Sequence, residues 1–305
     1  MSPPAPVFPN FRQSLLLLGG LVIVLGGVVG GLSLGADLPA PWLLGAMLGA
    51  EAAVVVVALR LARWPLRRIL AGAGFSTRML RRLLLLGAGN LLLIGSLLYL
   101  ISVVIGPVKQ PVLEDLLVAG TAAEFAVVAL GVAAGAPILE ELLVRGVVLR
   151  GLVASRGRTG GVLLSSLFFA VLHGPTLQAA PAFLNGVVWA LVLLRTGSLG
   201  ATVFLHALNN ATVFMLVQAS RHLVRPEDAA APETGPRLLA IAFVTATGLL
   251  GASVVGGVLR TLARDPERLS RFWGLPVAEV PEGTATTADA PAAATPAADG
   301  APRGG

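Results

Sequence analysis

The chain of 305 residues contains no cysteine, a single lysine, a single tyrosine and only 12% charged residues. Without cysteine it can form no disulfide, thiolate nucleophile or cysteine-ligated zinc site. Soluble domains carry about 25% charged residues, so the low charge excludes an ordinary soluble globular protein. Apolar residues take the place of the missing charge: 55% of the chain is hydrophobic, and the mean hydropathy is +0.85. The composition therefore predicts a protein embedded in a lipid bilayer.

Apolar runs of about 20 residues recur along the chain, and runs of that length predict membrane-spanning helices. Only helices or closed barrels can cross lipid, because the backbone must satisfy its own hydrogen bonds there. The alternating segments of about ten residues that are typical of a barrel are not found. We therefore predict an all-α polytopic integral membrane protein. About eight transmembrane helices are expected, at residues 14–35, 42–59, 83–105, 116–136, 161–174, 181–194, 199–219 and 238–259.

The basic residues predict the orientation, because cytoplasmic segments of membrane proteins carry an excess of Lys and Arg. With both termini in the cytoplasm, only Lys109, Arg221, Arg225 and Arg237 lie outside, Arg145 lies within a helix, and the other 17 of the 22 basic residues lie inside. We expect a multi-pass protein of a bacterial cell membrane with both termini cytoplasmic. The net charge of +6 is assigned to cytoplasmic loops, and no nucleic-acid partner is expected.

Four regions are predicted along the chain. Residues 1–110 would form N-terminal transmembrane helices, and residues 111–220 a helical core that carries the polar motifs. Residues 221–260 would form an outside loop and the last transmembrane helix. Residues 261–305 are expected to be a disordered cytoplasmic tail, because they are rich in Ala, Thr, Pro and Gly with few large apolar residues. Pro137 is expected to bend the fourth span, with the helix continuing through Glu140 to about Leu152.

Two adjacent glutamates interrupt the apolar run APILEELLVRGVVL. Glu141 and Arg145 are four residues apart, so they share a helix face and can pair. Glu140 lies about 100° around the helix and points elsewhere. One carboxylate is then neutralised, while its neighbour is left to take up a proton, as a general base or acid must. The alternative is an ion-pair network that only fixes helix packing, which is the more natural interpretation for Glu141 and Arg145.

Two further polar pairs have the same spacing of four residues. Phe169 precedes His173 at the end of a short span and would form a wall beside the imidazole. His206 and Asn210 would point at one spot, where they could donate two hydrogen bonds to a developing oxyanion. Both pairs also have structural interpretations, since His and Asn commonly form hydrogen bonds between membrane helices.

Together these clusters resemble the CPBP intramembrane protease family, which includes the CAAX prenyl endopeptidases and the bacterial Abi proteins. The family pattern is E-E-x-x-x-R, then F-x-x-x-H, then H-x-x-x-N or H-x-x-x-D, each on its own helix. Here the motifs read Glu140-Glu141-Leu-Leu-Val-Arg145, Phe169-Ala-Val-Leu-His173 and His206-Ala-Leu-Asn-Asn210. The resemblance covers residues 115–220, about a third of the chain.

The resemblance implies an intramembrane endopeptidase that cleaves a peptide or membrane-protein substrate. Glu140 would activate a water molecule with help from His173, and His206 and Asn210 would form the oxyanion hole. Glu141, Arg145 and Phe169 would support the site. The cavity would open toward the cytoplasm, and no cofactor would be needed. Zinc is a less favoured alternative, since a glutamate and two histidines can ligate it.

Two other functions stay open. Intramembrane carboxylates also mark proton paths, so Glu51 and Glu124 could extend a relay in a proton or ion transporter. Glu124 is 16 residues before Glu140, about 24 Å along a straight helix, and is expected to pack against Asn90 or Thr121. A non-catalytic membrane partner or immunity-type protein could also have the same fold.

Overall fold

The computed structural model of the chain describes residues 9–33, 39–63, 74–106, 121–174, 178–223, 234–262, 264 and 266–273. All secondary structure in these ranges is helical, so the predicted all-α fold is confirmed. The elements are α1 (Phe11–Ser33), α2 (Ala40–Ala62), α4 (Thr77–Ile105), α6 (Ala122–Leu130), the π-helical η1 (Gly131–Gly135), α7 (Ala136–Glu141), the π-helical η2 (Leu142–Val148), α8 (Leu149–Leu172), α9 (Ala179–Thr196), α10 (Leu199–Leu223), α11 (Thr234–Thr261) and α12 (Pro266–Trp273).

In the described part of the chain, seven helical runs are long and apolar enough to cross a membrane. The fourth run, Ala122–Leu172, has 51 residues and takes the place of two of the eight predicted spans. Its backbone breaks at Gly157, where φ is 72° and ψ is 175°, a left-handed conformation that glycine adopts most readily. The predicted continuation of the helix from Glu140 to about Leu152 is confirmed, because α7, η2 and the first part of α8 follow one another without a loop.

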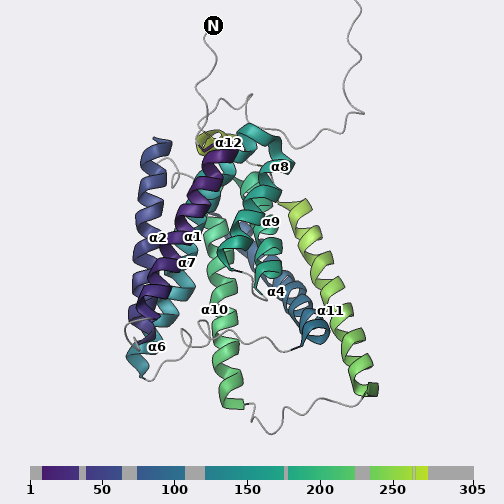
Figure 1. The fold of residues 1–305 in the computed structure, drawn as a ribbon. Coiled ribbons are helices and arrows are strands. Elements are labelled where there is room, and N and C mark those ends of the chain that lie inside the picture. Colours follow the sequence, from purple (N-terminus) through teal and green to yellow (C-terminus); the bar gives the residue numbers. More distant parts are fainter. Residues whose placement is uncertain are drawn as a thin grey trace, which may run out of the picture.

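Arginines gather at one end of the bundle, which we call the arginine-rich end. The first turn of α1, part of α8 and α12 lie there (Figure 1). Several arginines form contacts at this end: Arg82 donates to the Thr261 carbonyl at 2.8 Å, Arg195 to the Leu259 carbonyl at 2.6 Å, and the Arg150 guanidinium lies 3.9 Å from the Phe272 ring centroid. The chain therefore begins and ends its described helices on the same side, as the predicted topology requires.

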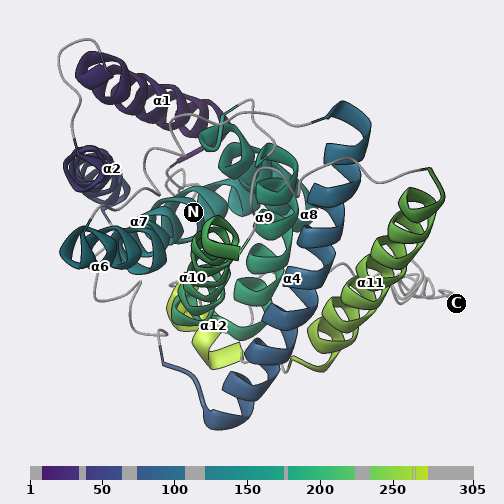
Figure 2. The ribbon, with the colours of Figure 1, turned by 90° about the horizontal axis from the view of Figure 1, so that it is seen from below.

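Helix α9 is the most enclosed of the membrane spans. It packs against α4, α8 and α10, and these helices surround it in the view along the bundle (Figure 2). Its buried residues include Trp189 and Asn185, and a Cβ on Gly186 would meet the backbone of Ser166 at 2.9 Å. This close approach of α8 and α9 sets the positions of the motif residues that they carry.

One predicted region differs in part from the structure. Residues 266–273, within the predicted disordered tail, form α12, because Leu269 and Phe272 bury all but 1% and 2% of their surface against the bundle. The rest of that tail, residues 274–305, lies outside the described residues, as do parts of the predicted loops at 64–73, 107–120 and 224–233.

Candidate active site

The Glu141–Arg145 pair is the most enclosed part of the site. Nη1 of Arg145 lies 3.0 Å from Oε1 of Glu141, and both side chains have 0% exposure. Nη2 of Arg145 also donates to the carbonyl of Gly186 on α9 at 3.3 Å. The guanidinium lies 4.5 Å from the ring centroid of Phe169 and 5.4 Å from that of Trp189. The predicted ion pair is therefore confirmed, and it joins η2 to α8 and α9.

His206 lies between the two glutamates. Its Nδ1 is 3.1 Å from Oε1 of Glu141, and its Nε2 is 3.8 Å from Oε2 of Glu140. Because an ionised carboxylate can only accept a hydrogen bond, Nδ1 donates to Glu141. Trp189 stacks on the imidazole at a centroid distance of 4.3 Å and an interplanar angle of 26°. Glu141 and Trp189 thus fix the ring so that Nε2 faces Glu140.

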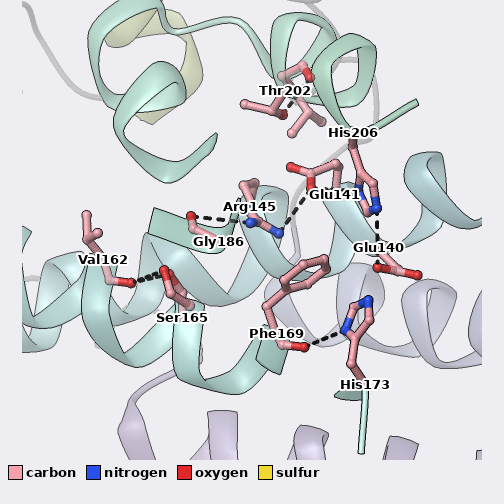
Figure 3. A network of polar contacts seen from close by, with 12 residues as sticks. Glu140, Glu141, Arg145, Val162, Ser165, Phe169, His173, Gly186, Thr202 and His206 are labelled. Carbon is pink, nitrogen blue, oxygen red and sulfur yellow. Dashed lines mark hydrogen bonds and ion pairs between the residues drawn. The ribbon is translucent and has the colours of Figure 1, made fainter. Parts of the chain in front are cut away.

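Glu140 has a different environment from its neighbour. No arginine or lysine in the described part of the chain forms an ion pair with it, whereas Glu141 has Arg145; in both carboxyls Oε2 is buried without a hydrogen-bond partner. Its carboxylate faces the imidazoles of His206 and His173 (Figure 3). The predicted division between a neutralised Glu141 and an unpaired Glu140 is therefore found in the structure.

His173 ends α8, one turn after Phe169. Its Nδ1 lies 2.9 Å from the Phe169 carbonyl oxygen, which can only accept, so Nδ1 carries the hydrogen and Nε2 is the acceptor atom of the ring. The Phe169 ring meets the imidazole edge-on at 4.6 Å between centroids. Phe169 thus forms the wall that the sequence predicted, and it contacts His206 as well, at 5.5 Å.

Asn210 is tied to the backbone of η1. Its Nδ2 donates to the Val132 carbonyl at 3.2 Å. In a π-helix the N–H of residue i+5 would bind that carbonyl, but residue 137 is proline and has no N–H. Asn210 therefore supplies the hydrogen bond that Pro137 cannot, and it retains a second amide hydrogen. Around Pro137 the regular α-helix is interrupted by the π-helical η1, which directly precedes α7.

A cavity of about 210 Å³ adjoins these residues and is lined by His173, His206 and Asn210. Three of the four predicted catalytic side chains therefore share one cavity, and the fourth, Glu140, contacts His206 beside it. The cavity continues past Asn185 to Leu98 on α4 and Val217 on α10. It thus extends away from the arginine-rich end, and the opening toward the cytoplasm stays a prediction.

Glu51 of α2 was noted in the sequence without a role. Leu44 and Leu48 pack on Gly131 and Gly135, while Val55 and Ala58 belong to one apolar cluster with Leu143 and Val147. In this parallel register, Glu51 lies level with residues 138–140. It is 6% exposed, its Oε1 has no hydrogen-bond partner, and its carboxyl interacts electrostatically with that of Glu140. α2 therefore adds a third carboxyl beside the motif pair.

Other features complete the comparison with the sequence. Glu124 forms a capping box with Thr121 at the start of α6, so Thr121 is its partner as predicted. Asn90 instead donates to Asn185 at 2.7 Å and joins α4 to α9. The sequence offered no signal for this bond or for Trp189, whose partners come from other helices.

Among the described residues, no group of three or more His, Cys, Asp or Glu side chains could hold a metal ion. The metal-free reaction stays a prediction.

Residues 122–212 match the family model described as type II CAAX prenyl endopeptidase Rce1-like. The match covers about a third of the chain, and its similarity is to an Rce1-like domain. All three motifs lie within it, so the resemblance to the CPBP and CAAX protease family is confirmed. Comparison with curated proteins gives no match, and comparison with solved structures gives none either. At the family level, the Rce1-like domain is that of a membrane protease, held in a multi-pass helical bundle.

Proposed function

We propose that the protein is an intramembrane endopeptidase in which Glu140 activates the attacking water. The supporting observation is the contrast between the two adjacent carboxylates. Glu141 is neutralised by Arg145 at 3.0 Å, whereas Glu140 forms no ion pair with an arginine or lysine of the described residues and faces two imidazoles beside a cavity. A general base needs to lie within hydrogen-bond reach of its proton, directly or through one water, and the position of Glu140, 3.8 Å from the cavity-lining His206, supports this role.

The reaction follows from these positions. Glu140 takes a proton from a water molecule that also donates a hydrogen bond to Nε2 of His173. The resulting hydroxide attacks the carbonyl carbon of the scissile peptide. His206 in its doubly protonated form donates from Nε2 to the oxyanion, and the second amide hydrogen of Asn210 donates to it as well. As the C–N bond breaks, Glu140 returns its proton to the departing amine, so the water is divided between the two products.

Glu141, Arg145, Phe169 and Trp189 act through the catalytic side chains. Glu141 orients His206, Arg145 keeps Glu141 ionised, and the two aromatic rings hold the imidazoles. The substrate is a peptide or membrane protein presented within the bilayer. We also propose residence in the cell membrane with both termini cytoplasmic, because the arginine-rich end carries most of the basic residues.

Cleavage of internally quenched peptides tests this function. The purified protein in lipid nanodiscs is incubated with C-a-a-X peptides, with and without a farnesyl group, and with a quenched apolar transmembrane peptide. We expect cleavage of at least one peptide and none by Glu140→Gln. Full activity of Glu140→Gln would show that the mechanism is wrong. If no peptide is cleaved and Glu140→Gln restores a deletion strain, the non-catalytic alternative holds.

The metal question has its own test. The proposed steps use only a carboxylate, two imidazoles and an amide, so cleavage should persist after dialysis against a strong chelator. Loss of cleavage that added zinc restores would support the zinc alternative.

A further inference from the structure

A pair of asparagines lies beside the cavity and has no part in the proposed reaction. Nδ2 of Asn90 on α4 donates to Oδ1 of Asn185 on α9 at 2.7 Å. Both side chains are buried, and of the two only Asn185 lines the cavity. Both helices are long and apolar enough to span a membrane. Polar side chains are costly to bury in such helices and are often functional there.

The direction of the hydrogen bond decides which group of Asn185 is left for the cavity. A side-chain amide has one oxygen acceptor and two N–H donors. Because Asn185 accepts through Oδ1, its NH2 group, on the other arm of the planar amide, is not used by Asn90. Among the described residues, no hydrogen bond donated by Nδ2 of Asn185 is found. Asn90 therefore holds Asn185 in an orientation that leaves two amide hydrogens for an occupant of the cavity.

Helix packing alone does not account for this pair. Amides commonly join membrane helices, but a partly satisfied buried network keeps the desolvation cost of its unpaired atoms. Oδ1 of Asn90 is buried without a hydrogen-bond partner in the described part of the chain, and the amide hydrogens of Asn185 are unused. A pair that served only to join α4 to α9 would be expected to satisfy more of its polar atoms.

Asn185 lies one helical turn from the catalytic side chains. Trp189 follows it by four residues on the same face of α9, and Trp189 stacks on His206 with 4.3 Å between the ring centroids. All three residues line the cavity. One turn of helix is about 5.4 Å long, and residues of an extended polypeptide are about 3.3 Å apart. A carbonyl bound by Asn185 would therefore be about two residues from the carbonyl that faces His206.

The chemistry of the Asn185 amide indicates the class of ligand. The described lining of the cavity carries no Asp, Glu, Lys or Arg, so a charged ligand group would find no ion partner in it. A helical segment has to unwind before one of its peptide bonds can be attacked, and unwinding frees its carbonyls. In lipid no water replaces the lost hydrogen bonds, and each unsatisfied group costs free energy. A fixed N–H donor in the cavity would satisfy one such carbonyl.

We propose that Asn185 is a substrate-binding residue whose amide donates a hydrogen bond to a backbone carbonyl of an unwound polypeptide segment, about two residues from the scissile peptide bond. Asn90 is a positioning residue that acts through Asn185. The identity of the ligand rests on the proposed function, whereas the availability of the donor rests on the contacts of the pair.

Peptide binding to the full-length Glu140→Gln variant in lipid nanodiscs tests this without cleavage. The probe is an apolar transmembrane peptide that carries a fluorescent donor. The acceptor dye is placed on Thr159→Cys, an exposed position, since the chain has no cysteine of its own. Energy transfer then gives the Kd within the bilayer. A series of the same peptide carries one backbone thioamide at successive positions, because a thiocarbonyl sulfur accepts hydrogen bonds more weakly than a carbonyl oxygen.

Two double variants are compared in this background. Asn90→Leu/Asn185→Leu removes both partners together, so no buried amide is left unpaired and the fold is retained. Ser96→Ala/Thr247→Val is the matched control, because it removes a polar contact of 3.2 Å between α4 and α11 whose residues are not part of the described cavity lining.

We expect the leucine variant to bind the peptide about 2- to 10-fold more weakly than the control, the range that one neutral hydrogen bond gives. A thioamide at one position should weaken binding to the control by a similar factor and leave binding to the leucine variant unchanged. Equal Kd values for the two variants would overturn the proposal, and so would thioamide effects that are the same in both. A purely structural role of the pair predicts no dependence on thioamide position.

Cleavage separates this inference from the proposed function. With Glu140 restored, the leucine variant should raise KM with little change in kcat, because the hydrogen bond is made in the ground state and the transition state alike. If binding depends on Asn185 but no quenched peptide is cleaved, the proposed function fails and the binding site stands. If peptides are cleaved but neither Kd nor KM responds to the leucine variant, the binding site fails and the proposed function stands.

Discussion

The two sides of the site differ in how their polar groups are satisfied. The enclosed side (Glu141, Arg145 and the Gly186 carbonyl) is fully buried, and its charges are paired. The cavity side (Glu140, His173 and Asn210) borders a cavity of about 210 Å³, and no arginine or lysine of the described residues pairs with Glu140. Buried charges are normally paired, so a carboxylate without a cationic partner beside a cavity indicates reactivity, whereas the one paired with Arg145 indicates support.

His206 connects the two sides through opposite edges of one ring. Its Nδ1 contacts Glu141 and its Nε2 faces Glu140. The enclosed side can therefore orient a group on the cavity side without touching substrate, as ring partners of functional histidines generally do. If this comparison is right, changing Glu140 should remove activity and spare stability. Changing Glu141 or Arg145 should lower the free energy of unfolding.

The largest effect is expected from Glu140→Gln. The amide keeps the shape of the side chain but cannot take a proton from water, and general-base catalysis contributes about 10²- to 10⁴-fold. Cleavage of the quenched peptides should fall by at least that factor, with an unchanged unfolding temperature in nanodiscs. Glu124→Gln is the matched control, because glutamine can still form the capping box with Thr121 and activity should remain. A large loss of stability in Glu140→Gln would break the comparison.

Arg145→Met should act mainly on stability. It leaves the Glu141 carboxylate buried without its cation, and breaking a buried pair in this way costs about 3–5 kcal/mol. The free energy of unfolding, measured by denaturant titration in mixed micelles, should fall by about that amount. The double variant Glu141→Leu/Arg145→Met should recover part of it, because no uncompensated charge remains. Equal stability of the single and double variants would contradict the pairing.

The sequence predicted what depends on local spacing. Apolar runs located the spans, and the four-residue spacing of Glu141 and Arg145 predicted their ion pair, as it predicted the contact of Phe169 with His173. The break at Gly157 lies between two predicted spans, where the chain has a glycine that can adopt a positive φ. These features depend on helix geometry, which is the same for every helix.

Features that depend on how helices pack could not be predicted in this way. Glu51 reaches the level of Glu140 only through the register of α2 against η1 and η2. Trp189 stacks on His206 because α9 and α10 adjoin. Asn210 was expected to face substrate, but its first partner is the Val132 carbonyl. The direction of the cavity likewise depends on where side chains of neighbouring helices leave space between the helices.

A smaller effect on stability is expected from changing Asn210, whose side chain binds the backbone of η1. Asn210→Ala leaves the Val132 carbonyl unpaired, which costs about 1–3 kcal/mol for a buried group. In a Pro137→Ala background the restored N–H can bind that carbonyl, so the same substitution should cost about 1 kcal/mol less. A double-mutant cycle of unfolding free energies measures this coupling. Cleavage should fall in both backgrounds, because the oxyanion donor is lost in each; recovery of activity with Pro137→Ala would show that Asn210 acts only through the backbone.

The smallest effect, and one of opposite sign, is expected at Glu51. Its carboxyl is buried on an otherwise apolar face of α2, has an oxygen without a partner and lies near a second carboxyl. Glu51→Gln replaces a carboxyl whose charged form is disfavoured by burial and by the neighbouring Glu140, so the free energy of unfolding should rise by about 1 kcal/mol. A carboxyl retained at such a cost is expected in functional sites, where stability and activity oppose each other, so cleavage should fall although the fold is more stable. Val55→Ala, one turn further on the same face, should lower stability by about 1–2 kcal/mol and leave the Glu140 chemistry intact. If Glu51→Gln stabilised the protein and left cleavage unchanged, Glu51 would not belong to the cavity side. α2 would then contribute only to the packing of the bundle.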